Sequence, residues 1–256
     1  MVRRTTIGSR SNAQLVRIRR LQADPVAYRK LGVAWLDGEH LLQAALARGN
    51  RLDELFVDEA RVDDVAIKAL MQGAERVAVV ESRLWREVCA LPSAPALGAL
   101  MKPAAGAVLP GVPTVVLDRL QDAGNVGSIL RSAAAFGVRQ LIALKGCAGL
   151  WSPKVLRSAM GAHFAMHLCE EAGDAELASL GVPMVATDSH GGVALPDGAL
   201  PEPCAWVFGH EGQGVGEALL RRCAMQVRIP QPGGEESLNV AAAAAICLYE
   251  SMRRRQ

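Results

Sequence analysis

Apolar residues along this chain form short runs and helical stripes that alternate with one another. In residues 12–22, Leu15, Ile18 and Leu21 recur at helical spacing, which predicts a helix with one buried face. Strands are predicted where compact apolar runs follow, at 33–36, 52–57 and 77–80. Amphipathic patterns predict the helices between these strands, at 39–48, 64–72 and 82–90. This alternation predicts a small α/β domain.

A second α/β domain is expected beyond a segment with no helical or strand period. Residues 102–113 read KPAAGAVLPGVP, whose three prolines and two glycines are typical of a linker. Past it, compact apolar runs predict strands at 114–118, 140–144, 183–187, 205–209 and 226–230. Such runs are typical of a mostly parallel sheet that helices cover on both faces. We predict a first domain at 1–102, a linker at 103–112 and a second domain at 113–256.

Composition narrows the class of protein. Of the 256 residues, 50% are hydrophobic and only 4% are aromatic, which favours α/β layers over a β-sandwich. The longest uninterrupted apolar run, 240–248, is far shorter than the roughly 20 residues that span a bilayer. Arg3 and Arg4 have no apolar segment behind them, so no secretory signal is expected. We therefore expect a cytoplasmic protein without a membrane span.

Cysteine and histidine spacing does not favour a metal site. The six cysteines form no C-x-x-C pair and no Cys/His pair at zinc spacing, so free and mostly buried thiols are expected. His163 and His167 are four residues apart, but they lie in an apolar context without a third ligand. We expect no metal.

The net charge of +2 conceals a strongly basic N-terminus. Residues 1–30 contain one acid, Asp24, and eight basic residues. Clustered basic side chains favour a polyanion because they release counterions when they meet it. Charge alone predicts a phosphate-binding surface and a solvated basic helix face about equally well. The candidates for contact with RNA are Arg3, Arg4, Arg10, Arg17, Arg19 and Arg20.

Three strand-to-loop junctions in the second domain carry polar and glycine-rich motifs, and open α/β sheets bind ligands at the carboxyl ends of their strands. They read LDRLQDAGNVGSILRSAAAFGV, VFGHEGQGVG and RIPQPGGEESLNVAAAAAICLYE. We expect Asn125 to cap the helix that carries Arg131, and Ser237 to begin the final helix. The glycines around Glu211 allow close approach to a ligand, although the loop is neither a Walker P-loop nor a GxGxxG motif. Taken singly, Asn125 and Ser237 are also consistent with ordinary caps, and Arg131 with a surface arginine.

Together, in this order and spacing, the junctions resemble the SpoU/TrmH family of the SPOUT methyltransferases. The patterns N-x-G-x-x-x-R, G-x-E-G-x-G and I-P-x-x-G-x-x-x-S-L-N-V all occur within residues 113–252. S-x-x-N at 9–12 and D-G-E-H at 37–40 are similar to the ribosomal-protein-like RNA-binding domain that often precedes this catalytic domain. The resemblance implies a C-terminal trefoil knot and a homodimer whose interface completes the active site.

The resemblance also implies a cofactor, S-adenosyl-L-methionine, and a reaction, methyl transfer to a ribose 2′-hydroxyl of structured RNA. The cofactor contacts that it implies are Thr187, Gly209, Ile229 and Leu238. The catalytic positions that it implies are Asn125, Arg131, Glu211, Ser237 and Asn239. An arginine is effectively always protonated, so we expect Arg131 to clamp the target phosphate and hydroxyl rather than act as the base. We expect Glu211, if backbone amides of its own loop hold it, to shape the pocket, and the proton acceptor stays open.

Several alternatives remain for the substrate and the activity. Ribosomal RNA is favoured over transfer RNA by the appended first domain and by the short tail Arg253 to Gln256, which lacks the long extension of the tRNA-acting branch. A non-catalytic assembly factor that binds ribosomal RNA is disfavoured by the complete set of polar motif residues. A small-molecule enzyme would leave the basic N-terminus without a purpose, and a base-methylating relative is disfavoured by the S-L-N-V segment. One departure from the resemblance precedes Asn125. The chain has Asp118, Arg119 and Gln121 to Ala123 where relatives commonly have an acidic residue followed by Asn-Pro or Asp-Pro.

Overall fold

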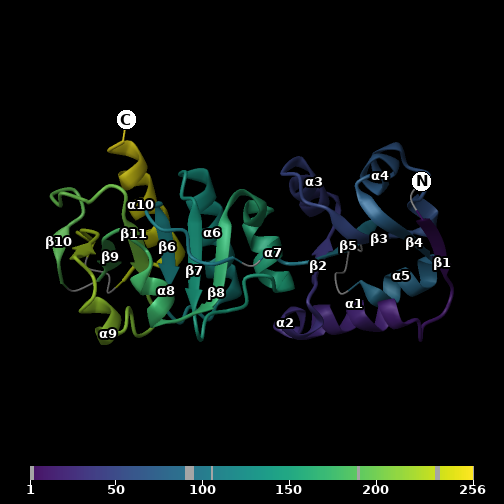
Figure 1. Ribbon diagram of the computed structural model, residues 1–256, viewed down its shortest axis with the longest axis horizontal. Coiled ribbons are helices and arrows are strands. Elements are labelled where there is room, and N and C mark those ends of the chain that lie inside the picture. Colours follow the sequence, from purple (N-terminus) through teal and green to yellow (C-terminus); the bar gives the residue numbers. More distant parts are fainter. Residues whose placement is uncertain (1–2, 90–94, 105, 189–190, 234–236, 256) are drawn as a thin grey trace. The chain divides into compact units, whose positions relative to one another are not determined.

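The computed structural model describes residues 3–89, 95–104, 106–188, 191–233 and 237–255. The chain divides into two compact units, each built of helices and strands (Figure 1). One contains Met1–Pro103 and Trp151–Phe164, and the other contains Ala104–Leu150 and Ala165–Gln256. The α/β class expected from the sequence is confirmed. The predicted limits 1–102, 103–112 and 113–256 stay predictions.

A five-stranded mixed sheet forms the centre of the first unit, in the order β1-β4-β3-β5-β2. Its strands are β1 (Arg3–Ile7), β2 (Ala34–Asp37), β3 (Leu52–Asp58), β4 (Ala74–Val80) and β5 (Leu97–Met101). β1, β4 and β3 are parallel, whereas β5 is antiparallel to both of its neighbours. Three of these strands, β2, β3 and β4, lie where the apolar runs predicted them. β1 was not predicted, because an edge strand that reads RRTTI has almost no apolar signal.

Helices cover both faces of this sheet, with α3 and α4 on one side and α1 and α5 on the other (Figure 1). The helices of this part of the chain are α1 (Ala13–Ala23), α2 (Ala27–Leu31), α3 (Glu39–Ala47), η1 (Glu59–Arg61), α4 (Val65–Met71) and α5 (Ser82–Val88). Leu15, Ile18 and Leu21 form the buried face of α1, as predicted. The core is aromatic at its centre, where the ring of Trp35 lies 5.9 Å from Phe56 and 6.3 Å from Trp85.

One segment from the middle of the chain belongs to the first unit. α7 (Pro153–Ala159) packs against β2, and η2 (Ala162–Ala165) follows it. Between them Gly161 has a left-handed φ of 83°, and a Cβ there would lie only 2.5 Å from the Cβ of Ala44. A glycine is therefore required where this segment approaches α3.

A seven-stranded sheet forms the centre of the second unit, and all of its strand pairs are parallel. Its order is β10-β12-β9-β11-β6-β7-β8. The strands are β6 (Thr114–Leu117), β7 (Gln140–Leu144), β8 (His167–Ala172), β9 (Met184–Thr187), β10 (Val193–Ala194), β11 (Ala205–Phe208) and β12 (Met225–Arg228). The five predicted strands of the second domain are confirmed. β8 was not predicted, because its sequence HLCEEA contains two adjacent carboxylates.

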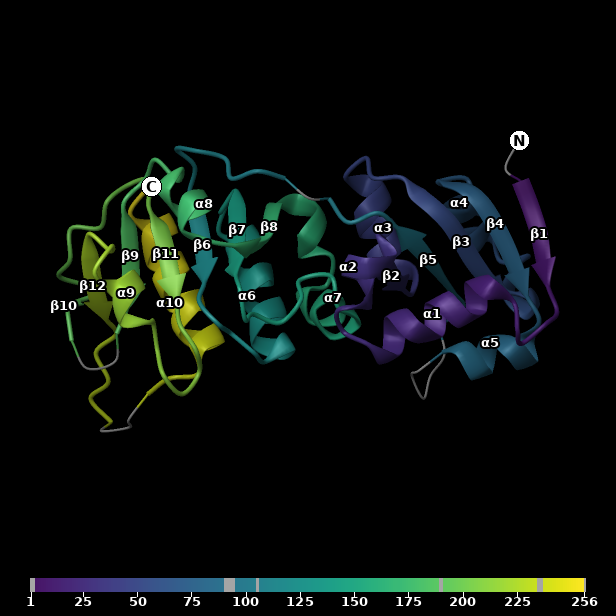
Figure 2. The same cartoon turned by 60° about the horizontal axis from the view of Figure 1, so that its bottom comes forward.

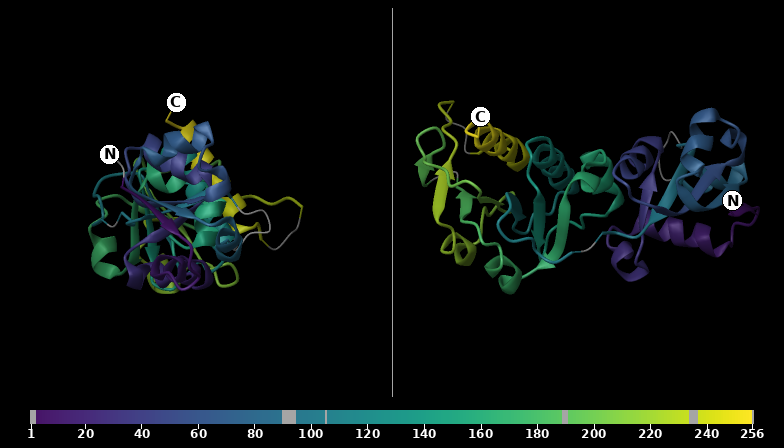
Figure 3. Two further views of the ribbon diagram at one scale, coloured as in Figure 1. Left: turned by 90° about the vertical axis from the view of Figure 1, so that its right-hand side faces the viewer. Right: turned by 45° about the horizontal axis from the view of Figure 1, so that its top comes forward.

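Helices lie on both faces of this sheet as well, which explains why its central strands β6, β7, β9 and β11 are almost entirely apolar. The helices are α6 (Ala123–Ala135), α8 (Asp174–Ala178), α9 (Glu217–Leu220) and α10 (Val240–Arg253). α6 and α10 lie side by side on one face, whereas α8 and α9 lie on the other (Figures 2 and 3). Trp206 donates its indole N–H to Ser251 at 2.8 Å, so a buried hydrogen bond joins β11 to α10. None of the described helices is long and apolar enough to cross a membrane.

Candidate functional site

A cavity of about 850 Å³ opens at the carboxyl ends of β9, β11 and β12. Its walls are the end of β9, the loop 209–215 after β11, and the segment that leads from β12 into α10. Seven of the nine residues expected to bind cofactor or act in catalysis line it: Thr187, Gly209, Glu211, Ile229, Ser237, Leu238 and Asn239. Residues from the second and third motifs therefore meet Thr187, at the end of β9, at one edge of the sheet, where parallel sheets bind ligands.

The glycine-rich loop 209–216 is folded tightly on itself. His210 and Gly214 exchange backbone hydrogen bonds of 3.0 and 2.8 Å, and the Gly212 N–H donates to the imidazole Nδ1 of His210. A Cβ at Gly209 would lie 2.1 Å from the backbone of Gly214 and Val215. Glycine at this position is therefore required for the packing of the loop, in addition to the backbone that it presents to the cavity.

A chain of side-chain hydrogen bonds joins the three motifs. Asn239 donates from Nδ2 to Oδ1 of Asn125 at 3.1 Å, and Asn125 donates from Nδ2 to Oε1 of Glu211 at 3.3 Å. The Glu211 carboxylate also accepts from the backbone N–H groups of Gln121 and Asp122, at 3.4 and 3.1 Å. We call this set of contacts the amide bridge. It connects the start of α10, the start of α6 and the glycine-rich loop.

Two predicted helix caps are wrong. α6 begins at Ala123 and its cap is Asp122, whose carboxylate accepts from the backbone N–H of Asn125 at 2.8 Å. Asn125 lies in the first turn, where its side chain is available for the amide bridge. α10 begins at Val240 and its cap is Asn239, so Ser237 lies in the preceding loop. The Asn239 Oδ1 accepts from two backbone N–H groups while its Nδ2 points to Asn125, so one side chain both caps the helix and forms the bridge.

Glu211 is held as a carboxylate. Burial raises the pKa of Glu211, but hydrogen bonds from backbone N–H groups and from Asn125 lower it more, so its pKa lies below the ordinary value of 4.5. The backbone N–H of Glu211 itself, an amide of its own loop, is one of these donors, an arrangement that the sequence suggested. Gln121 and Asp122 of the first junction are additional donors that were not predicted. With its oxygens accepting these bonds, Glu211 connects two loops.

The charges around the cavity restrict the ligand class. Among the described residues that line it, Asp188 and Glu211 are acidic and there is no lysine or arginine. Phosphate groups are usually bound by basic side chains or by a free helix N-terminus. The start of α10 lies at the wall, but the side chain of Asn239 already accepts from its first free N–H groups, so the wall does not suit a phosphate-rich nucleotide. Gln231 adds a buried Oε1 that lacks a hydrogen-bond partner among the described residues. The cavity suits a neutral or cationic ligand that brings an N–H donor.

Arg131 is separated from the cavity. It lies on α6 six residues after Asn125, about 9 Å further along the helix axis at the usual rise. Its side chain is exposed and makes no hydrogen bond or ion pair with the described residues. The structure therefore brings Asn125, Glu211 and Asn239 together and leaves Arg131 facing solvent.

Comparison with known proteins identifies the family. Residues 113–249, which contain all three motifs, match the SpoU rRNA Methylase family. The chain belongs to the SpoU family. The 23S rRNA (guanosine(2553)-2′-O)-methyltransferase RlmP of Bacillus subtilis is 31% identical over 224 residues, which cover 84% of this chain and 86% of that protein.

Two further proteins show how far the likeness extends. The 23S rRNA (guanosine-2′-O-)-methyltransferase RlmB of Bordetella pertussis is 38% identical over 146 residues, or 56% of this chain and 60% of its own. The crystal structure of the SpoU methyltransferase AviRb from Streptomyces viridochromogenes with the cofactor AdoMet has a TM-score of 0.85 at 26% identity. It covers 95% of this chain and 98% of AviRb, so the likeness to AviRb includes the first unit as well as the SpoU region.

The predicted RNA-contact arginines of this SpoU chain have different surroundings. Arg4 and Arg20 are exposed, and Arg10 is paired with Glu87 at 3.1 Å. Arg17 donates to the backbone oxygen of Leu31, and Arg19 to that of Arg10. Internal hydrogen bonds therefore fix Arg17 and Arg19 in place. The side chain of Arg3 lies outside the described residues.

The two histidines considered for a metal lie on different elements. His163 is buried in η2 beside Trp151, with the rings 5.2 Å apart. His167 begins β8 and its Nε2 contacts the backbone oxygen of Ala107 at 2.7 Å. Among the described residues, no group of three or more potential ligands could hold a metal ion.

The sequence motifs left out several residues of the site. Asp122 caps α6, and Asp118 and Arg119 contact the glycine-rich loop. Aspartate is among the residues preferred at helix N-caps, and this preference is the signal that could have indicated a cap at Asp122. Asp188 lines the cavity from outside the three motifs, and Gln231 lines it from a variable position of the third, so neither was indicated by its residue type.

Proposed function

We propose that this chain transfers a methyl group from S-adenosyl-L-methionine to a ribose 2′-hydroxyl of ribosomal RNA. The amide bridge is the observation that carries the proposal. It joins Asn125, Glu211 and Asn239, one residue from each SpoU motif, at the rim of a cavity suited to a phosphate-free ligand. SpoU relatives named as 2′-O-methyltransferases of 23S rRNA support the choice of substrate over transfer RNA.

The lining of the cavity fits S-adenosyl-L-methionine. Val227, Ile229 and Leu238 offer apolar surface for an adenosine, and the orphaned Oε1 of Gln231 can accept from an amino group. The carboxylates of Asp188 and Glu211, and the absence of lysine and arginine among the described lining residues, suit a cationic sulfonium. Thr187, Gly209, Ile229 and Leu238 are the residues that we propose to hold the cofactor. When bound, it would supply a methyl group activated by the sulfonium charge.

The residues of the chain would then position the RNA. We propose that Arg131 uses its planar guanidinium to hold the target phosphate and the ribose hydroxyl. Asn239 lines the cavity and is hydrogen-bonded to Asn125 in the first turn of α6, so this contact keeps the start of α6 aligned with the cavity. Glu211, already a carboxylate with its oxygens hydrogen-bonded, maintains the loop, and Ser237 at the cavity wall faces the ligand space. The hydroxyl proton leaves to a phosphate oxygen or to water, since Arg131 cannot accept it.

The proposal extends to the assembly and the place of action. We propose a homodimer, the trefoil knot of the SPOUT fold, and activity in the cytoplasm, where ribosomal RNA is found in bacteria. In support of the dimer, α10 exposes two large apolar side chains one turn apart, Ile246 and Tyr249. The arginines near the N-terminus, Arg3, Arg4, Arg10, Arg17, Arg19 and Arg20, are proposed to bind the RNA backbone.

Methyl transfer to purified RNA tests the function. Ribosomal RNA lacking the modification and total transfer RNA are each incubated with the protein and methyl-labelled S-adenosyl-L-methionine, and the RNA is then hydrolysed in alkali. A ribose 2′-O-methyl group blocks alkaline cleavage at its own nucleotide, so the label should appear in alkali-resistant dinucleotides from ribosomal RNA. Label in mononucleotides would indicate base methylation, and label only with transfer RNA would overturn the choice of substrate. Binding to ribosomal RNA without any transfer would indicate a non-catalytic assembly factor.

A further inference from the structure

Arg119 has a backbone conformation that an arginine rarely adopts. It lies two residues after the end of β6 and has a φ of 57°, in the left-handed region that favours glycine. A side chain in this region costs about 1 kcal/mol or more of conformational strain. Such strain persists where surrounding contacts hold the residue in place, so the contacts of Arg119 are informative.

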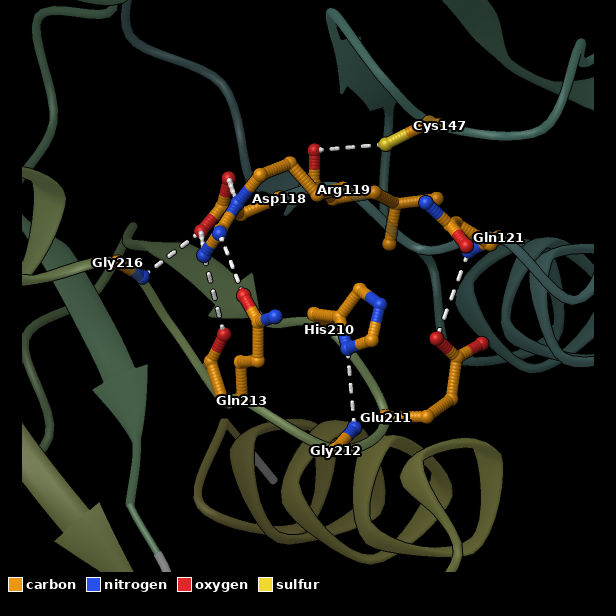
Figure 4. A network of polar contacts seen from close by, with 11 residues as sticks. Asp118, Arg119, Gln121, Cys147, His210, Glu211, Gly212, Gln213 and Gly216 are labelled. Carbon is orange, nitrogen blue, oxygen red and sulfur yellow. Dashed lines mark hydrogen bonds and ion pairs between the residues drawn. The ribbon is translucent and has the colours of Figure 1, made fainter.

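The guanidinium of Arg119 spans two junctions of the site. Its Nε and Nη2 each donate to the carboxylate of Asp118 at 3.0 Å, and its Nη1 donates to Oε1 of Gln213 at 3.1 Å (Figure 4). Nη2 also reaches the backbone oxygen of Gly214 at 3.4 Å. Arg119 therefore binds its own neighbour and the middle of the glycine-rich loop at once.

Asp118 completes the connection from the other end of that loop. Its Oδ2 accepts from the backbone N–H of Gly216 at 2.8 Å, immediately before α9 (Figure 4). The Asp118 side chain is only 9% exposed, so its charge needs the paired Arg119. The hydrogen bonds that Arg119 donates to Asp118, together with the negative charge of Asp118, raise the pKa of the Arg119 guanidinium above its ordinary value. A charge-assisted pair of this kind is stronger than an ordinary surface ion pair.

The glycine-rich loop is thus held at both of its ends by residues 118–122. Glu211 reaches the backbone of Gln121 and Asp122, while Arg119 and Asp118 hold Gln213, Gly214 and Gly216. This loop forms one wall of the cavity. Loss of either attachment would leave glycines, which have the largest conformational freedom of any residue, free to sample other shapes.

We infer that Asp118 and Arg119 form a clamp that holds the loop 209–216 in the shape that binds the cofactor. Both act as positioning residues, because their described contacts are to protein groups. The inference rests on the proposed function for the identity of the cofactor, but the clamp itself is a property of the free protein. The N–H of Gly216 and the carbonyl of Gly214 should be held in the absence of any ligand.

Hydrogen–deuterium exchange of the free protein tests the clamp. Arg119→Gly removes the guanidinium and also relieves the left-handed strain, so this variant should fold. Arg221→Ala is the matched control, because Arg221 is exposed and pairs with Glu217 within its own helix. In Arg119→Gly, peptides that cover 209–216 should exchange about tenfold faster than in the wild type, as expected for loss of a charge-assisted bond. Peptides from β3, in the other unit, should be unchanged, and equal exchange of the loop in both proteins would overturn the clamp.

Cofactor affinity then tests the purpose of the clamp. Isothermal titration with S-adenosyl-L-homocysteine should give a Kd about tenfold weaker in Arg119→Gly and close to wild type in Arg221→Ala. The turnover number at saturating S-adenosyl-L-methionine should change by less than about threefold, because no group that contacts RNA is lost. Arg119→Lys should restore part of the affinity, since one ammonium can replace some of the donors. Faster exchange with unchanged affinity would overturn the link to the cofactor, whereas absence of binding in the wild type would overturn the proposed function itself.

Discussion

Asn239 donates its side-chain N–H to the side-chain oxygen of Asn125 at 3.1 Å, across 114 positions of the chain. The bond ties the first residue before α10 to the first turn of α6, and Asn125 passes the connection on to Glu211. A polar contact between such distant segments fixes their spacing more tightly than apolar packing alone. Substitution of either asparagine should therefore affect the same step.

A double-mutant cycle on this pair should show strong coupling. Asn125→Ala removes the bridge, and Asn239→Ser keeps a cap for α10 but is too short to reach Asn125. Each variant should lower the turnover number by about tenfold or more, and the double variant should be little worse than the poorer single one. Single-turnover methyl transfer at saturating cofactor measures the effect. Two multiplicative losses would show that the residues act independently.

The buried hydrogen bond between Trp206 and Ser251 should stabilise the second unit. Ser251→Ala leaves the indole N–H of a residue that is 2% exposed without an acceptor, which should reduce the free energy of unfolding by about 1–2 kcal/mol. Ser158→Ala is a suitable control, because the Ser158 hydroxyl bonds the carbonyl of Lys154 in its own helix. Urea denaturation followed by circular dichroism measures both. Equal stability of the two variants would contradict the importance of the contact.

Much of the fold follows from the apolar pattern, because the central strands are buried on both faces. β6, β7, β9 and β11 read as uninterrupted apolar runs and were predicted for that reason. β1 and β8 lie at sheet edges and carry arginines or carboxylates, so hydrogen bonding to one neighbour defines them more than burial does. An apolar pattern does not record hydrogen bonding.

The ionisation of Glu211 should make the free energy of unfolding depend on pH. Its pKa is lower in the folded protein than the ordinary value of 4.5, so ionisation favours folding. The stabilisation is present above pH 4.5 and is lost as the pH falls through the lower folded pKa. The stability difference between wild type and Glu211→Gln should therefore be largest near neutral pH and shrink in acid. A constant difference between about pH 3 and 7 would contradict the bonded carboxylate.

Most of the cofactor and catalytic residues that the motifs indicated lie around one cavity, but the motifs did not predict the structural role of each residue. Asp122 and Asn125 are both good caps and lie three residues apart, and only the observed start of α6 at Ala123 distinguishes them. Likewise, Arg119 looks like an ordinary surface arginine in the sequence, because a left-handed φ leaves no pattern in a single chain. Its contact with Gln213 depends on how two distant junctions pack.

Methyl transfer should be impaired even when Arg131 is replaced by lysine. A lysine keeps the charge but cannot hold two oxygens with a planar fork, so Arg131→Lys should reduce the turnover number by about tenfold or more. Cofactor affinity should be unchanged, since Arg131 does not line the cavity. Steady-state transfer to ribosomal RNA and titration with S-adenosyl-L-homocysteine separate the two effects. An unchanged turnover number would contradict the proposal that the guanidinium of Arg131 holds the phosphate and the hydroxyl at the same time.

The central claim, ribose methylation of ribosomal RNA, is tested most directly in cells. Mass spectrometry can map 2′-O-methyl nucleotides in all RNA from a strain that lacks this chain, and from the same strain carrying wild type or Asn125→Ala. We expect one ribose methylation in ribosomal RNA to disappear on deletion, to return with the wild type and to remain low with the variant. An unchanged ribose-methylation map, or a loss confined to transfer RNA, would contradict the account.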